Sequence, residues 1–131
     1  MRIVFDENVP DCIITALAAL ASIAFPGKLE ITSVMILEMG GNPDEDVLHA
    51  VGENGILITY DKDFKRQRAL YDIIKQYKIG VFWVRQPKVK TVWLLAQLMV
   101  AQWDTMLKTA SDTERPFLYE VTKNGVSKLV F

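Results

Sequence analysis

The sequence lacks the residues and motifs on which several common kinds of catalytic or structural site depend. It has 131 residues with one cysteine and one histidine, so neither an internal disulfide nor a zinc centre can be built. A single cysteine is typical of proteins from the reducing cytosol. A Gly-rich phosphate loop, a nucleophile elbow and a Cys–His pair are also missing. Fifteen basic residues against sixteen acidic ones give a net charge of −1, so any basic surface for nucleic acid must be local.

The longest apolar run, at residues 12–25, reads CIITALAALASIAF. It follows FDENVPD, which is acidic where a secretory signal peptide needs positive charge. It is also too short to cross a bilayer as a helix. We therefore expect no membrane association, a buried helix in a soluble cytoplasmic protein, and Cys12 as a small buried hydrophobic residue among apolar neighbours.

Short strand-like runs alternate with longer helical patterns along most of the chain. This alternation predicts a parallel sheet with helices on both faces, within one domain that spans residues 1–131. Two further strand-like runs surround Asn124-Gly125, which predicts a C-terminal β-hairpin attached at a sheet edge. Expected strands are 2–5, about 29–37, 56–59 and 79–84, and expected helices are about 10–21, 44–53, 62–77 and 90–109.

The last of these helices is apolar around most of its circumference. Trp93 and Leu94 lie beside its core-facing residues, so we expect the helix to be covered on two sides. A homodimer or another protein partner would cover the second side, there or along the hairpin. The expected core residues, spaced by three and four, are Val92, Leu95, Met99, Trp103 and Met106.

Acidic residues gather where the strands are expected to end. Asp6 and Glu7 follow the first strand, Asp61 and Asp63 follow the third, and residues 44–46 (Asp-Glu-Asp) open a helix. In open parallel sheets the functional site lies beyond the carboxyl ends of the strands, so these acids should converge on one edge. Because clustered carboxylates repel one another, we expect a hard divalent cation such as Mg²⁺ between them.

A carboxylate-held cation of this kind supports phosphoryl or phosphodiester transfer. The alternative for each acid taken singly is that it caps a helix, since residues 44–46 and Asp61 occupy positions where caps are favourable. His49 lies within the acidic helix, where we expect it to face solvent.

Basic residues follow the third acidic segment, in KDFKRQR. In a helix, Lys62 and Arg66 would share one face, as would Lys65 and Arg68. Such a stripe could hold the phosphates of a polyanion, although a solvated helix face is the simpler interpretation. Further basic residues follow the fourth strand at the same expected end of the sheet, namely Arg85, Lys88 and Lys90.

Three motifs in order along the chain resemble those of PIN-like domains, in particular the group associated with VapBC-type toxin–antitoxin systems. FDENVP resembles the first motif, NPDEDVLHAVGENG the second and ILITYDKDF the third. The basic segment that follows and the tail RPFLYEVTKNGV also resemble that group. The matching positions are Asp6 and Asn8, then Asp44 and Glu45, then Thr59 and Asp61.

The resemblance implies a three-layer α/β/α fold with a central, mostly parallel sheet. It implies a Mg²⁺- or Mn²⁺-dependent endoribonuclease, the toxin of a pair, which acts on RNA and is inhibited by a cognate antitoxin. Asp63 matches an acid found in only some relatives. Two roles are open for Glu45, support of the site or capping of its helix. The implied metal ligands are Asp6, Asp44 and Asp61, with Asn8 and Thr59 orienting them.

Two other functions remain open at the level of sequence. One is a catalytically inactive PIN-like module that only binds a partner. The other is a receiver-like phosphoacceptor, with Asp6, Glu7 and Asp61 as its acids. A receiver, however, is expected to carry Thr or Ser at the end of its fourth strand, where VFWVRQ has neither, and it gives Asp44 no role.

Overall fold

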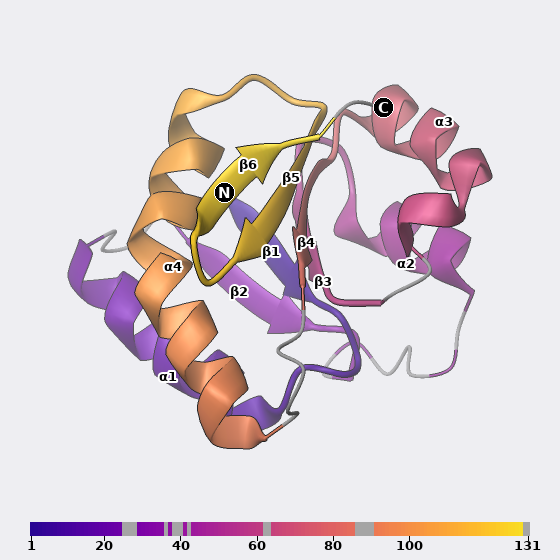
Figure 1. Cartoon of the computed structure of the whole chain (residues 1–131). Helices are drawn as coiled ribbons and strands as arrows, with labels where there is room; N and C mark the ends of the chain where they lie inside the picture. The colour runs from indigo at the N-terminus through magenta and orange to yellow at the C-terminus, as the bar shows by residue number, and fades with distance from the viewer. Residues whose placement is uncertain are drawn as a thin grey trace.

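The computed structural model describes residues 1–24, 29–35, 37, 41, 43–61, 64–85 and 91–129. In these residues a six-stranded sheet lies between two layers of helices (Figure 1). The strands occur in the spatial order β2-β1-β3-β4-β5-β6, and every neighbouring pair is parallel except β5–β6. They are β1 (Arg2–Phe5), β2 (Glu30–Ser33), β3 (Ile56–Thr59), β4 (Gly80–Val84), β5 (Phe117–Thr122) and β6 (Gly125–Lys128).

Helices follow the strands as the alternating pattern predicts, and the α/β fold class is confirmed. Side chains alternate between the two faces of each strand, so the sheet separates two apolar clusters. One cluster contains residues of α1 and α4, and the other contains residues of α2 and α3. The helices are α1 (Asp11–Ala24), α2 (Asp44–Val51), α3 (Arg68–Tyr77) and α4 (Val92–Asp112), with a 3₁₀ turn, η1, at Phe64–Arg66.

The sheet differs from the prediction at its outer strands, β2 on one side and the β5–β6 hairpin on the other. The second strand was expected to reach about residue 37, but it ends at Ser33. The Val34 N–H still bonds the Phe5 carbonyl at 2.9 Å, and the chain then turns. The predicted hairpin around Asn124-Gly125 is present, but its first strand, β5, pairs in parallel with β4 over five residues. That strand is therefore an integral part of the main sheet.

The prediction for α1 is wrong in one respect, because only one side of the helix is buried. Ile13, Ile14 and Leu17 face the core, whereas Cys12 is exposed. Residues at helical spacings of three and four share a face, and Cys12 lies outside the face that these three define. Ile23, near the end of the helix, is 81 % exposed.

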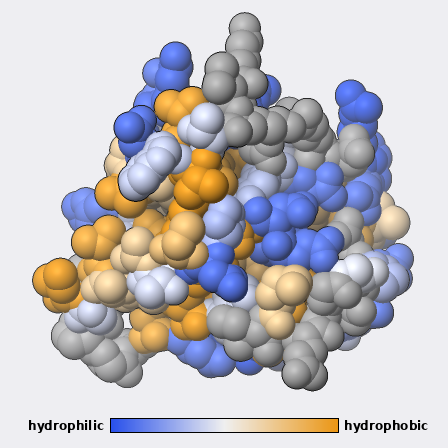
Figure 2. Space-filling view, turned by 90° about the horizontal axis from the view of Figure 1, so that it is seen from below, coloured by the Kyte–Doolittle hydropathy of each residue, from blue (hydrophilic) through white to orange (hydrophobic). Residues whose placement is uncertain are grey.

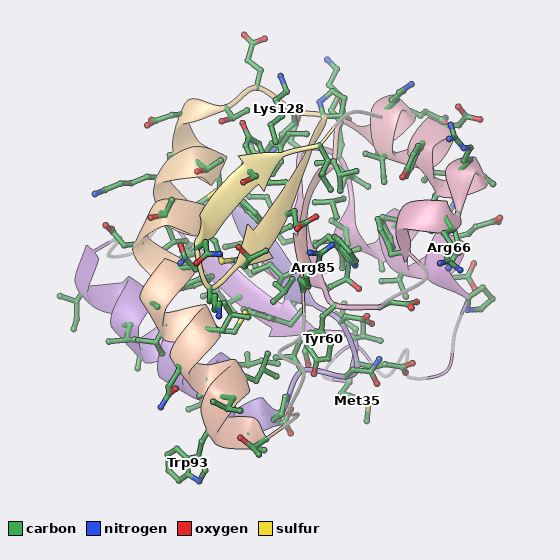
Figure 3. All side chains as sticks on the ribbon, in the orientation of Figure 1. Met35, Tyr60, Arg66, Arg85, Trp93 and Lys128 are labelled. Carbon is green, nitrogen blue, oxygen red and sulfur yellow. The ribbon has the colours of Figure 1, made fainter. Side chains whose placement is uncertain are left out.

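Helix α4 also carries apolar side chains on two sides. Four of its five expected core residues are buried, but Val92 is 50 % exposed because it lies in the first turn, at the rim of the molecule. The neighbouring Trp93 is 80 % exposed and projects from this end of the helix (Figure 3). Within the described ranges, the helices are too short or too polar to span a bilayer.

Candidate active site

The first and the third acidic segments lie at the carboxyl ends of two adjacent strands, β1 and β3. Asp6 directly follows β1, and its N–H donates to the Ile58 carbonyl of β3 at 2.9 Å. Asp61 lies two residues beyond the end of β3. Because β1 and β3 are parallel neighbours, both residues stand at the same edge of the sheet. Tyr60, which lies between Thr59 and Asp61, marks this edge in Figure 3.

Thr59 connects the two acids. Its hydroxyl donates to Asp6 Oδ2 at 2.8 Å, and its oxygen accepts the Asp61 N–H at 3.3 Å. The other carboxylate oxygen of Asp6 accepts the Glu7 N–H at 2.7 Å. Thr59 is only 2 % exposed, so its hydroxyl is held within the protein. The resemblance to PIN-like domains implied that Thr59 orients the metal ligands, and the Thr59 side chain does contact Asp6 directly.

Trp83 on β4 contacts the same segment from the other side. It is paired with Thr59 in the register of β3 and β4, and its indole N–H donates to the Asp61 carbonyl at 2.8 Å. The Arg85 guanidinium lies over the Trp83 ring, 5.8 Å from its centroid, and forms an ion pair of 3.7 Å with Glu120. The sequence analysis assigned Trp83 no role. A buried tryptophan needs an acceptor for its N–H, and that requirement was the available signal.

Glu7 links the end of β1 to the segment before α2. Its Oε2 accepts the N–H of Gly41 at 2.7 Å, across 34 positions of sequence. Sequence analysis counted Glu7 among the edge acids without a defined contact. The structure shows that the Glu7 carboxylate accepts a backbone N–H. This hydrogen bond places Gly41, which precedes α2 in the chain, near the end of β1.

The second acidic segment begins α2 on the face of the sheet to which α3 also packs. The last residue of α2 lies near the amino end of β3, because the helix leads into that strand. The first residue, Asp44, therefore lies toward the carboxyl end of the strands. Pro43 is the N-cap residue and makes no side-chain capping bond. Glu45 is exposed in the first turn, and Asn8 is exposed in the turn after β1.

The structure leaves part of the predicted metal site undescribed. The side chains of Asp44 and Lys65 lie outside the described part of the chain. So do the whole of Lys62, Asp63, Lys88 and Lys90. Among the side chains that are described, no group of three or more His, Cys, Asp or Glu residues could hold a metal ion. Of the three predicted metal ligands, Asp6 and Asp61 are therefore the two whose side chains the structure describes, and both are half-buried.

The segment that carries the basic residues is not the single continuous helix that the sequence predicted. Residues 62–77 were expected to be one helix, but η1 and α3 are separated by Gln67, whose ψ of 77° is not helical. Phe64 in η1 is fully buried, so this turn is anchored to the core. Lys65 and Arg68 consequently belong to two separate helical segments. Arg66 and Arg68 are both exposed near the segment that follows Asp61.

Tyr60 is buried beside the acidic edge. Its burial, together with the negative charge of Asp6, raises the pKa of its phenol from 10.0 to about 12. The phenol is therefore protonated throughout the neutral range. It can donate a hydrogen bond there, but it cannot act as a general base.

Replacing Tyr60 by phenylalanine should remove a source of alkaline instability. A folded-state pKa above the unfolded value stabilises the fold below pH 10, and that contribution disappears as pH rises toward 12. The shift of about two pKa units corresponds to roughly 2–3 kcal/mol. Urea unfolding at pH 8 and pH 11.5 should show a smaller loss of stability in Tyr60→Phe than in wild type. Equal losses in both proteins would contradict the assignment.

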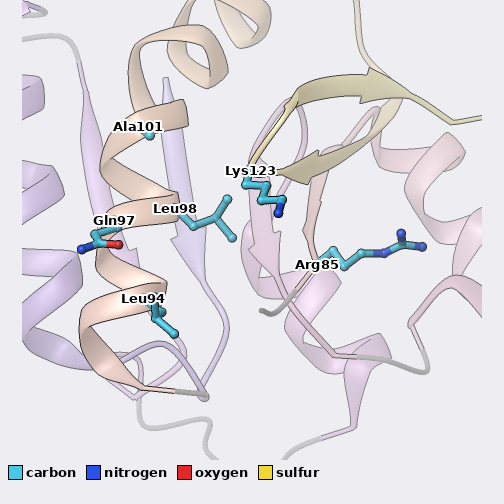
Figure 4. A pocket seen from close by; sticks show the side chains of 6 residues that line it. All are labelled: Arg85, Leu94, Gln97, Leu98, Ala101 and Lys123. Atoms are coloured by element: carbon cyan, nitrogen blue, oxygen red, sulfur yellow. The ribbon is translucent and has the colours of Figure 1, made fainter. Parts of the chain in front are cut away.

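A separate hollow of about 340 Å³ lies between α4 and the turn that joins β5 to β6 (Figure 4). Leu94, Leu98 and Ala101 of α4 form its apolar side. Arg85, after β4, and Lys123, in the turn, stand across from that helix (Figure 4). This hollow adjoins the part of α4 whose outer side is exposed.

The end of the molecule that carries Tyr60 is divided by polarity. In the view from below, hydrophobic residues gather on the left, the side of α1 and α4, and hydrophilic ones gather at the centre and right (Figure 2). The apolar helical side and a hydrophilic region are thus adjacent on this face of the molecule (Figure 2).

Comparison with known proteins gives one informative result. A family model described as a PIN-like domain matches residues 1–86. The match covers β1 through β4 and therefore all three acidic motifs, and it ends before α4. Neither the curated proteins nor the solved structures include a significant match.

Proposed function

The chain belongs to the PIN-like domain family, and from this membership we propose that it is a Mg²⁺- or Mn²⁺-dependent endoribonuclease, the toxin of a toxin–antitoxin pair. PIN-like domains are generally nucleases, which supports hydrolysis of a phosphodiester. The observation that carries the proposal is the bonded arrangement of Asp6, Thr59 and Asp61 at one edge of the sheet.

The donor atoms at this edge suit a hard cation. Carboxylate oxygens are the ligands that Mg²⁺ prefers, usually one or two of them with water completing an octahedron. Asp6 and Asp61 would hold the ion, with Asp44 as the third ligand and Asp63 as a further acid at the same site. Thr59 fixes the orientation of Asp6, as residues behind a metal ligand commonly do.

The roles of the other residues follow from their positions. A bound Mg²⁺ or Mn²⁺ supplies Lewis-acid chemistry, which activates water and neutralises charge on the phosphate. Asp6 and Asp61 would hold that ion, while protonated Tyr60 keeps an uncharged side chain beside Asp6. Asn8 and Glu45 are exposed at the same end and support this site in the proposal.

Exposed basic residues are proposed to contact the RNA backbone. Arg66 and Arg68, together with Lys62 and Lys65, follow the third acidic motif closely enough to bind phosphates on either side of the cleavage point. Each such exposed contact is worth up to about 1 kcal/mol.

The double variant Arg66→Gln/Arg68→Gln should bind single-stranded RNA roughly tenfold more weakly, since two phosphate contacts are lost. The slope of log affinity against log salt should fall by about 1.4, which is about 0.7 per contact. Fluorescence anisotropy in EDTA measures both quantities without cleavage. The charge-matched control, Lys108→Gln/Lys128→Gln, changes exposed residues elsewhere and should bind like wild type. Equal losses in the two double variants would contradict a specific basic contact surface.

The antitoxin, or a second copy of the chain, is proposed to bind the outer side of α4 and the neighbouring hairpin. Trp93 and Val92 are exposed there, and the hollow in Figure 4 lies between the same two elements. Large apolar side chains on a surface are common at protein–protein interfaces.

The direct test is incubation of the purified protein with total RNA in Mg²⁺ or in EDTA, beside Asp61→Asn. Cleavage should require both Mg²⁺ and Asp61. RNA binding without cleavage under every metal condition would favour the alternative, a catalytically inactive PIN-like binding module.

A further inference from the structure

We propose that Trp83 is a positioning residue of the acidic site, which holds the backbone of Asp61 in the orientation that its carboxylate needs. This role rests on the proposed metal-dependent function and extends it to a residue on a third strand. Trp83 would not contact metal or RNA. It would act through Asp61 alone.

Both peptide groups of Asp61 are held by hydrogen bonds to side chains. Its N–H bonds the Thr59 hydroxyl at 3.3 Å, and its carbonyl accepts the Trp83 indole N–H at 2.8 Å. Backbone on both sides of the Asp61 Cα is therefore fixed by side chains of neighbouring strands. Since the direction of the Cα–Cβ bond follows from the backbone, these two bonds determine where the carboxylate can reach.

The donor itself is rigidly placed. Trp83 is 9 % exposed and belongs to the apolar cluster that also contains residues of α2 and α3. Its backbone lies opposite Thr59 in the parallel register of β3 and β4. The chain of contacts Asp6–Thr59–Asp61–Trp83 thus crosses β1, β3 and β4 in order, and links Asp61 to a buried residue of the core.

A second tryptophan provides a matched control within the same protein. The indole N–H of Trp103 donates to the Leu17 carbonyl at 3.0 Å, between α4 and α1. Both tryptophans are buried, and both make one indole-to-carbonyl bond. The two bonds differ in that only the bond of Trp83 ends on a residue of the proposed site. A purely structural role predicts equivalent consequences for the loss of either bond.

The experiment compares wild type, Trp83→Phe and Trp103→Phe, each checked for native circular dichroism. Phenylalanine keeps an aromatic ring and removes the N–H. Calorimetric titration with Mn²⁺ measures metal affinity, and hydrogen exchange in the metal-free proteins measures the opening of the Asp61 amide. Trp83→Met, whose flexible apolar side chain also lacks a hydrogen-bond donor, replaces Trp83→Phe in the comparison should the latter not fold.

Trp83→Phe should bind Mn²⁺ roughly tenfold more weakly, within the usual range for residues behind a metal ligand, and its Asp61 amide should exchange faster. Trp103→Phe should lose thermal stability to a similar extent but keep its Mn²⁺ affinity within about twofold of wild type. Equal Mn²⁺ affinities in the two variants would overturn the positioning role. If wild type itself binds no Mn²⁺, the proposed metal site fails, and this role fails with it.

Discussion

Asp6→Asn is expected to lower the rate of RNA cleavage by more than roughly 100-fold, because 10- to 100-fold is already the usual cost of altering a residue behind a metal ligand. The substitution removes a negative charge and one of the oxygens available to a cation. RNA binding should persist, since a phosphate-contacting surface gains from the loss of a nearby negative charge. Cleavage of a labelled single-stranded RNA in Mg²⁺ measures the first effect, and anisotropy measures the second.

The fold should tolerate this change. The asparagine oxygen can still accept the Glu7 N–H, and its amide can donate to the Thr59 oxygen, which has a second lone pair for the Asp61 N–H. Because the buried Thr59 O–H then loses its carboxylate acceptor, we expect the free energy of unfolding to fall by about 1–2 kcal/mol, which leaves the protein folded. Asp104→Asn makes the same chemical change at an exposed carboxylate of α4 that pairs with Lys108, and it should leave cleavage unchanged. If the Asp6→Asn protein cleaved RNA at the wild-type rate, Asp6 would not be part of the catalytic site.

Thr59→Val should reduce cleavage by roughly 10- to 100-fold while the protein stays folded. Valine fills the same space but removes the hydroxyl that bonds both Asp6 and the Asp61 N–H. Because Thr59 is almost fully buried, the unpaired groups should also lower the free energy of unfolding by about 1–3 kcal/mol.

Thr59→Ser distinguishes the two consequences of this substitution. Serine restores the hydroxyl without the methyl group, so cleavage should recover most of the way even if stability does not. Initial cleavage rates and urea unfolding of the three proteins provide the comparison. Wild-type cleavage by Thr59→Val would show that this hydroxyl does not orient the site.

Sequence patterns predicted the parts of the protein that depend on local periodicity. Strand β1 ends before Asp6 and β3 ends at Thr59, as expected, because short β-branched runs are followed by polar residues. Parallel pairing then puts both strand ends at one edge. The α/β class and the two acids at the edge follow from rules that need no knowledge of distant contacts.

The parts that sequence patterns missed depend on contacts between distant segments. The bond from Trp83 to the Asp61 carbonyl requires the register of β3 against β4, and the bond from Gly41 to Glu7 requires a long-range approach. The break at Gln67 was missed because the burial of Phe64 outweighs the helical preference of its neighbours. Cys12 was misassigned for a different reason, since its apolar sequence neighbours lie on another side of α1.

The central claim is that carboxylates at the edge of the sheet hold a divalent ion for hydrolysis of RNA. Chemical analysis of the ends of the cleavage products tests it most directly. Water as the nucleophile does not require the ribose 2′-hydroxyl, so Mg²⁺-dependent products should carry 5′-phosphate and 3′-hydroxyl ends, and EDTA should abolish them. Products with 2′,3′-cyclic phosphate ends, or cleavage that continues in EDTA, would contradict the claim.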